Sequence, residues 1–185
     1  MVQSTHDKYD RILNDLEEER RQRDRVVNVD EKRHQLVVFS IARYLFAISG
    51  SHVRTILPVK EIIPVPGTPQ EFPGVIHVRG QIYSVLSLHR LFGWTSPEVQ
   101  SSNRIAIIAH ETIETGIFMD AVENVLSVAE RTLGLPLSTL DEPVRSVVDK
   151  QFFFDDGRPV SIVNIPKLFD LVEQGVARFQ QTFMK

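Results

Sequence analysis

Short blocks of apolar and β-branched residues, separated by polar turns, make up most of the chain after residue 34. In the first half these blocks occupy residues 35–41, 44–49, 62–65, 74–78 and 81–87. Blocks of this length and composition predict β-strands. The last two are separated only by Arg79 and Gly80, and a glycine supplies the positive φ that a two-residue hairpin turn needs. Short helices are expected at residues 51–56 and 88–92.

The second half of the chain predicts the same succession of strands and turns. Blocks at residues 104–110 and 116–120 predict one hairpin. The Asp-Gly pair at residues 156–157 predicts another, because this dipeptide favours a tight turn. A helix is expected from Pro166, with Asn164 or the next residue as its cap, because proline is favoured at the first helical position.

Two segments of the first half recur in the second half. Residues 84–92 match residues 161–169 in the order serine, two apolar residues, serine or asparagine, apolar, any, basic, leucine and phenylalanine. Residues 51–59 match residues 120–128, and each begins with a residue suited to cap a short helix. Internal repetition indicates two similar structural units. Each unit would have a marginal core by itself, so packing against its twin is expected to stabilise it.

The chain is therefore interpreted as mainly β, with two similar barrels packed together, short helices between strands and a C-terminal helix. Residues 35–93 would form the first β-barrel subdomain and residues 94–169 the second, while residues 170–185 continue the C-terminal helix. Residues 1–34 are a charged extension. A helix is expected there over about residues 9–25, because its apolar residues recur at helical spacing. It is either a solvated leader or a docking helix.

Composition and charge narrow the functional classes. The net charge of −3 argues against a general nucleic-acid binder, which would be basic. The chain has no cysteine, so disulfides and thiolate metal sites are excluded. No apolar run is long enough to span a membrane, and the charged N-terminus lacks the apolar segment of a signal peptide. A cytoplasmic location is expected.

Motifs for catalysis or cofactor binding are missing from the sequence. None of the six histidines has the spacing of a metal-ligand pair, and neither a phosphate-binding loop nor a nucleophile elbow occurs. The carboxylate of Asp120 has a place in the repeat that indicates a helix cap. We therefore expect no catalytic residue, no metal, no cofactor and no enzymatic activity.

The sequence Gly-Val-Ile-His-Val-Arg-Gly at residues 74–80, followed by Val-Leu-Ser-Leu at residues 85–88, resembles the CheW family of chemotaxis coupling proteins. The resemblance extends from about residue 36 to residue 169. It implies two five-stranded Src-homology-3-like barrels, which agrees with the repeat. It also implies a non-catalytic adaptor that links the cytoplasmic tips of methyl-accepting chemoreceptors to the regulatory domain of a CheA-type histidine kinase. Such an adaptor meets the membrane only through the receptor array.

The resemblance also implies a receptor-binding groove between the barrels. The residues that match positions implicated there are Val53, Ile56, Val75, Arg79, Gly80, Ile82 and Gly116. Valine and isoleucine side chains would accept the apolar stripe of a helical tip, and Arg79 would reach an acid or a carbonyl. The same apolar residues are equally suited to the core. The resemblance assigns no kinase-binding residues.

Five positions depart from the family pattern. Thr55 stands where glutamate is usual, His77 replaces asparagine, Ser84 proline, Ser87 aspartate and His89 arginine. These changes remove charges around the first barrel and indicate a divergent member with its own partners, in a non-flagellar or accessory pathway. Two other interpretations stay open. One is a barrel scaffold or inhibitory subunit no longer coupled to receptors, and the other, less favoured, is a small nucleic-acid-binding barrel.

Overall fold

The computed structural model describes residues 31–154 and 156–183. The chain divides into two units, residues 1–32 and 33–185, and the fold below is that of the second. The helix expected over residues 9–25 lies outside the described residues.

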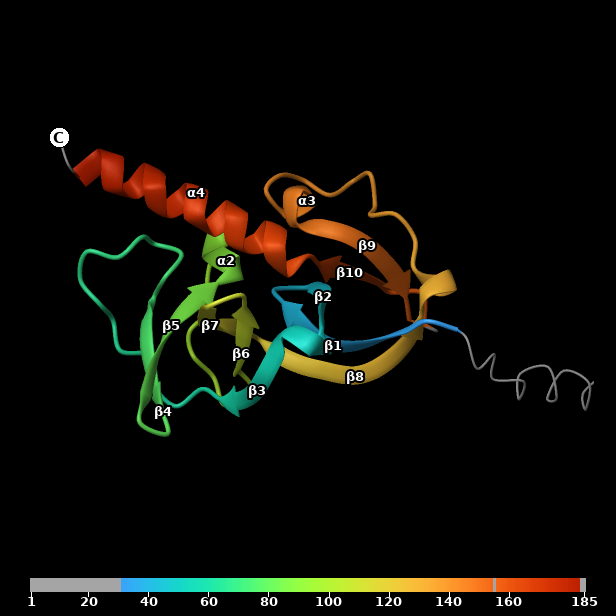
Figure 1. Cartoon of the computed structure of the whole chain (residues 1–185), viewed down its shortest axis with the longest axis horizontal. Coiled ribbons are helices and arrows are strands. Elements are labelled where there is room, and N and C mark those ends of the chain that lie inside the picture. Colours follow the sequence, from blue (N-terminus) through green and yellow to red (C-terminus); the bar gives the residue numbers. More distant parts are fainter. Residues whose placement is uncertain (1–30, 155, 184–185) are drawn as a thin grey trace, which may run out of the picture. The chain divides into compact units, whose positions relative to one another are not determined.

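Two five-stranded sheets, each curled as a half-barrel, make up the unit (Figure 1). Sheet A has the order β8-β1-β2-β10-β9, with β1 (Arg33–Ile41), β2 (Tyr44–Ser49), β8 (Ala121–Ala129), β9 (Val148–Phe153) and β10 (Pro159–Val163). Sheet B has the order β3-β6-β7-β5-β4, with β3 (Val53–Pro58), β4 (Gly74–Val78), β5 (Gln81–Ser87), β6 (Arg104–His110) and β7 (Ile113–Met119). The mainly β fold class is confirmed.

Short helical elements and one long helix connect and cover the sheets. They are η1 (Gly50–His52), α2 (Leu88–Leu91), η2 (Glu130–Thr132), α3 (Val144–Val147) and α4 (Ile165–Phe183). The turn expected over residues 51–56 is shorter than predicted, because β3 begins at Val53 and pairs with β6. The strand expected at residues 62–65 is a single bridge between Ile63 and Val75. In Figure 1, α4 starts beside β10 and runs past α2.

The internal repeat corresponds to equivalent places in the two sheets. The repeated segments at residues 51–59 and 120–128 contain β3 and β8, which are the first strands in the two orders. The segments at residues 84–92 and 161–169 contain β5 and β10, each followed by a helix. Both of these strands have one parallel neighbour, β7 for β5 and β2 for β10. The repeat therefore describes two copies of one sheet topology.

The predicted boundary between residues 93 and 94 is wrong, because the two halves exchange their first hairpins. The β1–β2 hairpin joins β8, β9 and β10 from the second half, whereas β6–β7 joins β3, β4 and β5 from the first. The exchange arises after β2, where η1 leads the chain into β3, and β3 pairs with β6. The edge of β1 pairs instead with β8. Each sheet thus requires both halves of the chain.

One core cluster holds the two sheets together. Sheet A contributes Phe39 and Phe46 from one face, sheet B contributes Ile108 and Ile117, and α4 contributes Leu168. The opposite faces of the sheets carry smaller separate clusters. Burying each such large apolar side chain contributes about 1.5–3 kcal/mol. The shared cluster therefore packs the two sheets against each other.

The start of α4 is tied to β9 through polar side chains. Asn164 Oδ1 accepts a hydrogen bond from the Lys167 N–H at 3.0 Å, which confirms the predicted cap. Asn164 Nδ2 also donates to Asp149, and Lys167 Nζ donates to Asp149 Oδ1 at 2.5 Å. Partial burial opposes the shift, but these hydrogen bonds and the charges of Lys167 and Lys150 lower the pKa of Asp149 below its usual value of 3.8.

We expect the Asp149→Asn substitution to lower the melting temperature at neutral pH by about 1–3 °C, because the pair with Lys167 is partly exposed. A carboxylate with a lowered pKa in the folded state contributes stability above pH 3.8, and that contribution is lost as the pH falls through the folded-state pKa. The difference in melting temperature should therefore shrink as the pH falls below 3.8 and disappear below the folded-state pKa of Asp149. Glu98→Gln, on an exposed loop, serves as the control. A constant difference at all pH values would contradict this role.

Candidate functional site

The β4–β5 hairpin presents its tip to solvent. Arg79 has φ 50° and Gly80 has φ 89°, so the predicted two-residue turn is confirmed. Val78 pairs with Gln81 on either side of it. Both turn residues are exposed, which leaves the Arg79 side chain available to a partner.

The two faces of this hairpin differ in burial. Ile76 and Val85 point into the cluster inside sheet B, whereas their neighbours Val75 and Ile82 lie on the outer face. Ile82 is 72% exposed, the most exposed large apolar side chain among the described strand residues. It pairs with His77, which is also exposed.

The apolar surface continues from β5 onto β7. These strands are parallel and in register, and Ser84 Oγ lies 2.8 Å from Thr115 Oγ1. Two residues before this contact, each strand carries an exposed isoleucine on the same face, Ile82 on β5 and Ile113, which is 45% exposed, on β7. We call Val75, His77, Ile82, Ser84, Ile113 and Thr115 the hairpin face. Sequence reasoning missed Ile113, because only the β5–β7 pairing brings it to this surface.

A groove of about 310 Å³ extends the hairpin face beneath α4. Ser84, Ile113 and Thr115 form one wall, and Val172 and Val176 of α4 form part of the other. A volume of this size accommodates apolar side chains of a partner. The outer face of sheet B therefore has a mostly apolar, accessible end beside Arg79.

Val53 and Ile56 do not lie on the hairpin face. They lie on β3, opposite Ile108 and Ala106 of β6, and are half-buried against the core shared by the two sheets. Strands β3 and β4 stand at opposite ends of the order in sheet B. The predicted binding residues thus form two groups, one at the hairpin and one on β3.

The predicted contact of Gly116 with a partner needs correction. It is buried, and a Cβ atom there would lie 2.6 Å from Ile105 Cγ2 and 3.4 Å from the Ser84 carbonyl oxygen. The residue is a glycine because β7 passes close to its neighbours. It therefore cannot contact a partner directly.

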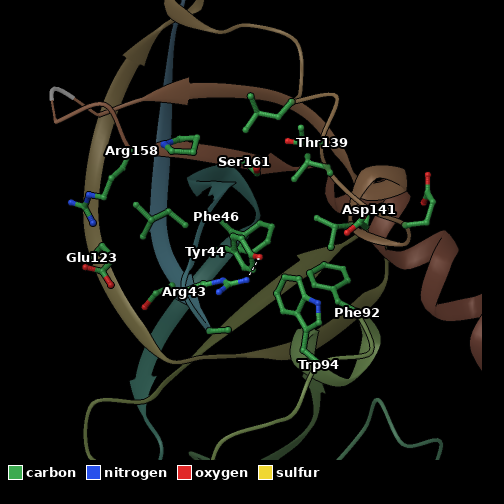
Figure 2. Close-up of a pocket in the computed structure, with 18 residues that line it drawn as sticks. Arg43, Tyr44, Phe46, Phe92, Trp94, Glu123, Thr139, Asp141, Arg158 and Ser161 are labelled. Atoms are coloured by element: carbon green, nitrogen blue, oxygen red, sulfur yellow. Dashed lines mark hydrogen bonds between the residues drawn. The ribbon is translucent and has the colours of Figure 1, made fainter.

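A second cavity, of about 600 Å³, lies beside sheet A (Figure 2). Its walls come from β2, from the residues after α2, from β10 and from the loop that leads into α3. Tyr44, Phe46, Phe92 and Trp94 form its aromatic part. None of the binding residues predicted from the sequence lines this cavity. Sequence reasoning missed Trp94, because it lies in a polar stretch that is typical of a linker.

Asp120 connects the sheets instead of capping a helix. The Ala42 N–H, in the β1–β2 turn, donates to Asp120 Oδ2 at 2.6 Å, and His89 Nε2 lies 3.2 Å from the same oxygen. No helix follows Asp120, since β8 begins at Ala121, so the predicted cap is wrong. Among residues 31–154 and 156–183, no cluster of three or more histidine, aspartate or glutamate side chains could hold a metal ion.

Comparisons with known proteins agree with the architecture. The family model described as a CheW-like domain matches residues 35–173. The chain belongs to the CheW family. It is 26% identical over 147 residues to the chemotaxis protein CheW of Thermotoga maritima, a match that covers 78% of this chain and 95% of that protein. It is 25% identical over 112 residues to the CheW protein of Treponema pallidum, covering 58% of this chain and 66% of that protein.

A solved structure supports the same assignment. The scaffolding protein TtCheW of Thermoanaerobacter tengcongensis superposes with a TM-score of 0.63 at 27% identity, covering 71% of this chain and 89% of that one. That neighbour is a scaffolding protein, and this chain shares its family and fold.

Three of the five departures from the family pattern have partners inside the protein. Ser87 is buried and its Oγ accepts from the Arg90 N–H at the start of α2. His89 is buried beside Asp120, and Ser84 contacts Thr115. Only Thr55 and His77 are exposed. Three of these five residues therefore make polar contacts within the protein, and the other two lie on its surface.

We expect Gly116→Val to destabilise the protein by about 1–3 kcal/mol, because the new side chain would overlap Ile105. Gly134→Ala is the matched control, since nothing lies within 4 Å of its Cβ position, and we expect a change within about 0.5 kcal/mol. Denaturant unfolding measures both. Equal stability of the two variants would contradict the packing role of Gly116.

Proposed function

We propose that this CheW-family protein is a non-catalytic adaptor that couples chemoreceptors to a CheA-type histidine kinase in a two-component signalling array. The observation that carries the proposal is the exposed surface of sheet B, where Arg79 at the hairpin tip and the exposed apolar side chains of Ile82 and Ile113 occur on a CheW fold. An apolar patch flanked by a guanidinium suits recognition of a helical partner.

The receptor contact is proposed at the hairpin face, with Arg79 and Gly80 at its edge and Val53 and Ile56 of β3 as the second group. The cytoplasmic tip of a methyl-accepting chemoreceptor is a helical hairpin, which offers an apolar stripe to Ile82 and Ile113. Arg79 would bind a carboxylate or a carbonyl at the end of that stripe. Arrays gain strength from many weak contacts, so a small interface suffices.

The second partner is the regulatory domain of the kinase, whose contact residues we do not assign. A cytoplasmic location follows from these partners, with membrane association only through the receptor array. The described part of the chain has no helix that is long and apolar enough to cross a bilayer.

A second candidate function is a barrel scaffold or inhibitory subunit that no longer binds receptors. The departures at Thr55 and His77 favour it, because both side chains are exposed on sheet B. A nucleic-acid-binding barrel is less supported, since the hairpin face has no base-stacking aromatic platform and Phe153 is exposed while Phe152 is buried.

We expect Arg79→Ala to weaken receptor binding by about tenfold, because a charge-assisted hydrogen bond is lost, and to leave kinase binding unchanged. Ile82→Ser should weaken receptor binding to a similar extent through lost apolar contact. The measurement is titration calorimetry of the full chain against a receptor signalling tip and, separately, against the kinase regulatory domain.

Arg145→Ala, at an exposed arginine of α3, is the matched control and should bind both partners normally. Melting temperatures check that each variant folds. Kinase binding without receptor binding would favour the uncoupled scaffold. Binding to neither partner would contradict the adaptor proposal.

A further inference from the structure

The aromatic cavity beside sheet A has the size and composition of a binding site. Its volume of about 600 Å³ falls in the range of sites that accept small ligands or peptide side chains. Tyr44 and Trp94 lie with ring centroids 5.2 Å apart, and Phe92 meets Trp94 edge-on at 5.3 Å. Phe46 is buried, whereas Tyr44 is 43% exposed, so the aromatic surface runs from the core to solvent.

Aromatic side chains at an accessible cavity favour protein recognition. Tryptophan and tyrosine provide large contact areas at a low cost in side-chain entropy and are enriched among the residues that dominate binding energy. The aliphatic side chains of Leu137, Leu140 and Val144 complete the apolar wall from the loop and α3. This wall would accept one large apolar or aromatic residue.

The charges around the cavity leave an excess of free carboxylates. Glu123, Asp141 and Glu142 line it, and their side chains make no hydrogen bond or ion pair with other residues in the described ranges. Arg158 is already paired with Asp156 at 2.8 Å. Arg43 is the other cation of the lining, and it faces an aromatic ring instead of an acid.

Arg43 shows how a guanidinium contacts this aromatic wall. Its Cζ lies 5.3 Å from the centroid of the Tyr44 ring, and its Nη2 donates to the Tyr44 hydroxyl at 3.1 Å. A cation within about 6 Å of an aromatic face is attracted by the ring. A further guanidinium or ammonium entering from a partner would find both exposed aromatic surface and free carboxylates.

We propose that this cavity binds a short segment of a partner protein in which an apolar or aromatic residue is flanked by basic residues. The central residue would enter the aromatic wall, and the basic residues would pair with Glu123 on one side and with Asp141 and Glu142 on the other. No residue of the proposed receptor contact lines the cavity, so this site is independent of the proposed function.

Trp94 reports directly on the cavity, because it is the only tryptophan in the chain. The full chain is titrated with three probes, acetyl-Arg-Phe-Arg-amide, acetyl-Glu-Phe-Glu-amide and arginine amide, while tryptophan fluorescence is recorded. We expect a saturable change with the basic peptide only. No saturable change, or equal binding of the acidic peptide, would overturn the proposal. Binding of arginine amide as tight as that of the basic peptide would instead indicate a site for free organic cations and also overturn it.

Variants then locate the interaction. The combined Glu123→Gln, Asp141→Asn and Glu142→Gln protein should bind the basic peptide about tenfold more weakly, since the carboxylates that would pair with its two guanidiniums are lost. Glu61→Gln, Glu98→Gln and Glu111→Gln together remove equal charge from exposed sites outside the cavity and should leave binding unchanged. Thr139→Phe, which fills the cavity from an exposed loop, should abolish binding. Equal weakening by both charge sets, or full binding by the filled variant, would place the peptide elsewhere.

Discussion

The pairing of β1 with β8 is the constraint on which the rest of the structure depends. This antiparallel ladder runs from Arg33 opposite Ala129 to Ser40 opposite Ala121, and it joins the first strand of the unit to the second half of the chain. Because β8 occupies this edge, β3 pairs with β6 in the other sheet. Both sheets then require both halves, and a single apolar cluster between them stabilises the unit.

The exchange of hairpins also creates the binding surfaces. The aromatic cavity combines Tyr44 of β2 and Trp94 after α2 with Asp141 from the loop before α3 and Ser161 of β10. The hairpin face likewise combines Ile82 from the first half with Ile113 from the second. Neither surface would exist if each half folded on its own. The structure therefore presents two separate apolar regions, each bordered by charged side chains that suit a different partner.

Divergence within the family follows the same division between interior and surface. Ser87 and His89 are buried, where an aspartate and an arginine are usual in the family, and each has a polar contact of its own. Buried polar groups need partners, and the Ser87 hydroxyl and His89 Nε2 have them in the Arg90 N–H and in Asp120. Thr55 and His77 have no such constraint. Differences in partner choice are thus expected at the exposed positions of sheet B.

The sequence by itself determined most of the strands, the C-terminal helix, the repeat, the turn at Arg79 and Gly80, the cap at Asn164 and the family, because these depend on local backbone preferences and on patterns along the chain. It also singled out Arg79 and Ile82, which are both exposed. The tertiary structure alone decided which hairpin joins which sheet. Two equivalent hairpins carry the same alternation of apolar residues, so their partners are chosen by long-range strand pairing and not by local sequence. That choice buried Gly116, exposed Ile113 and assembled the aromatic cavity from segments far apart in the chain.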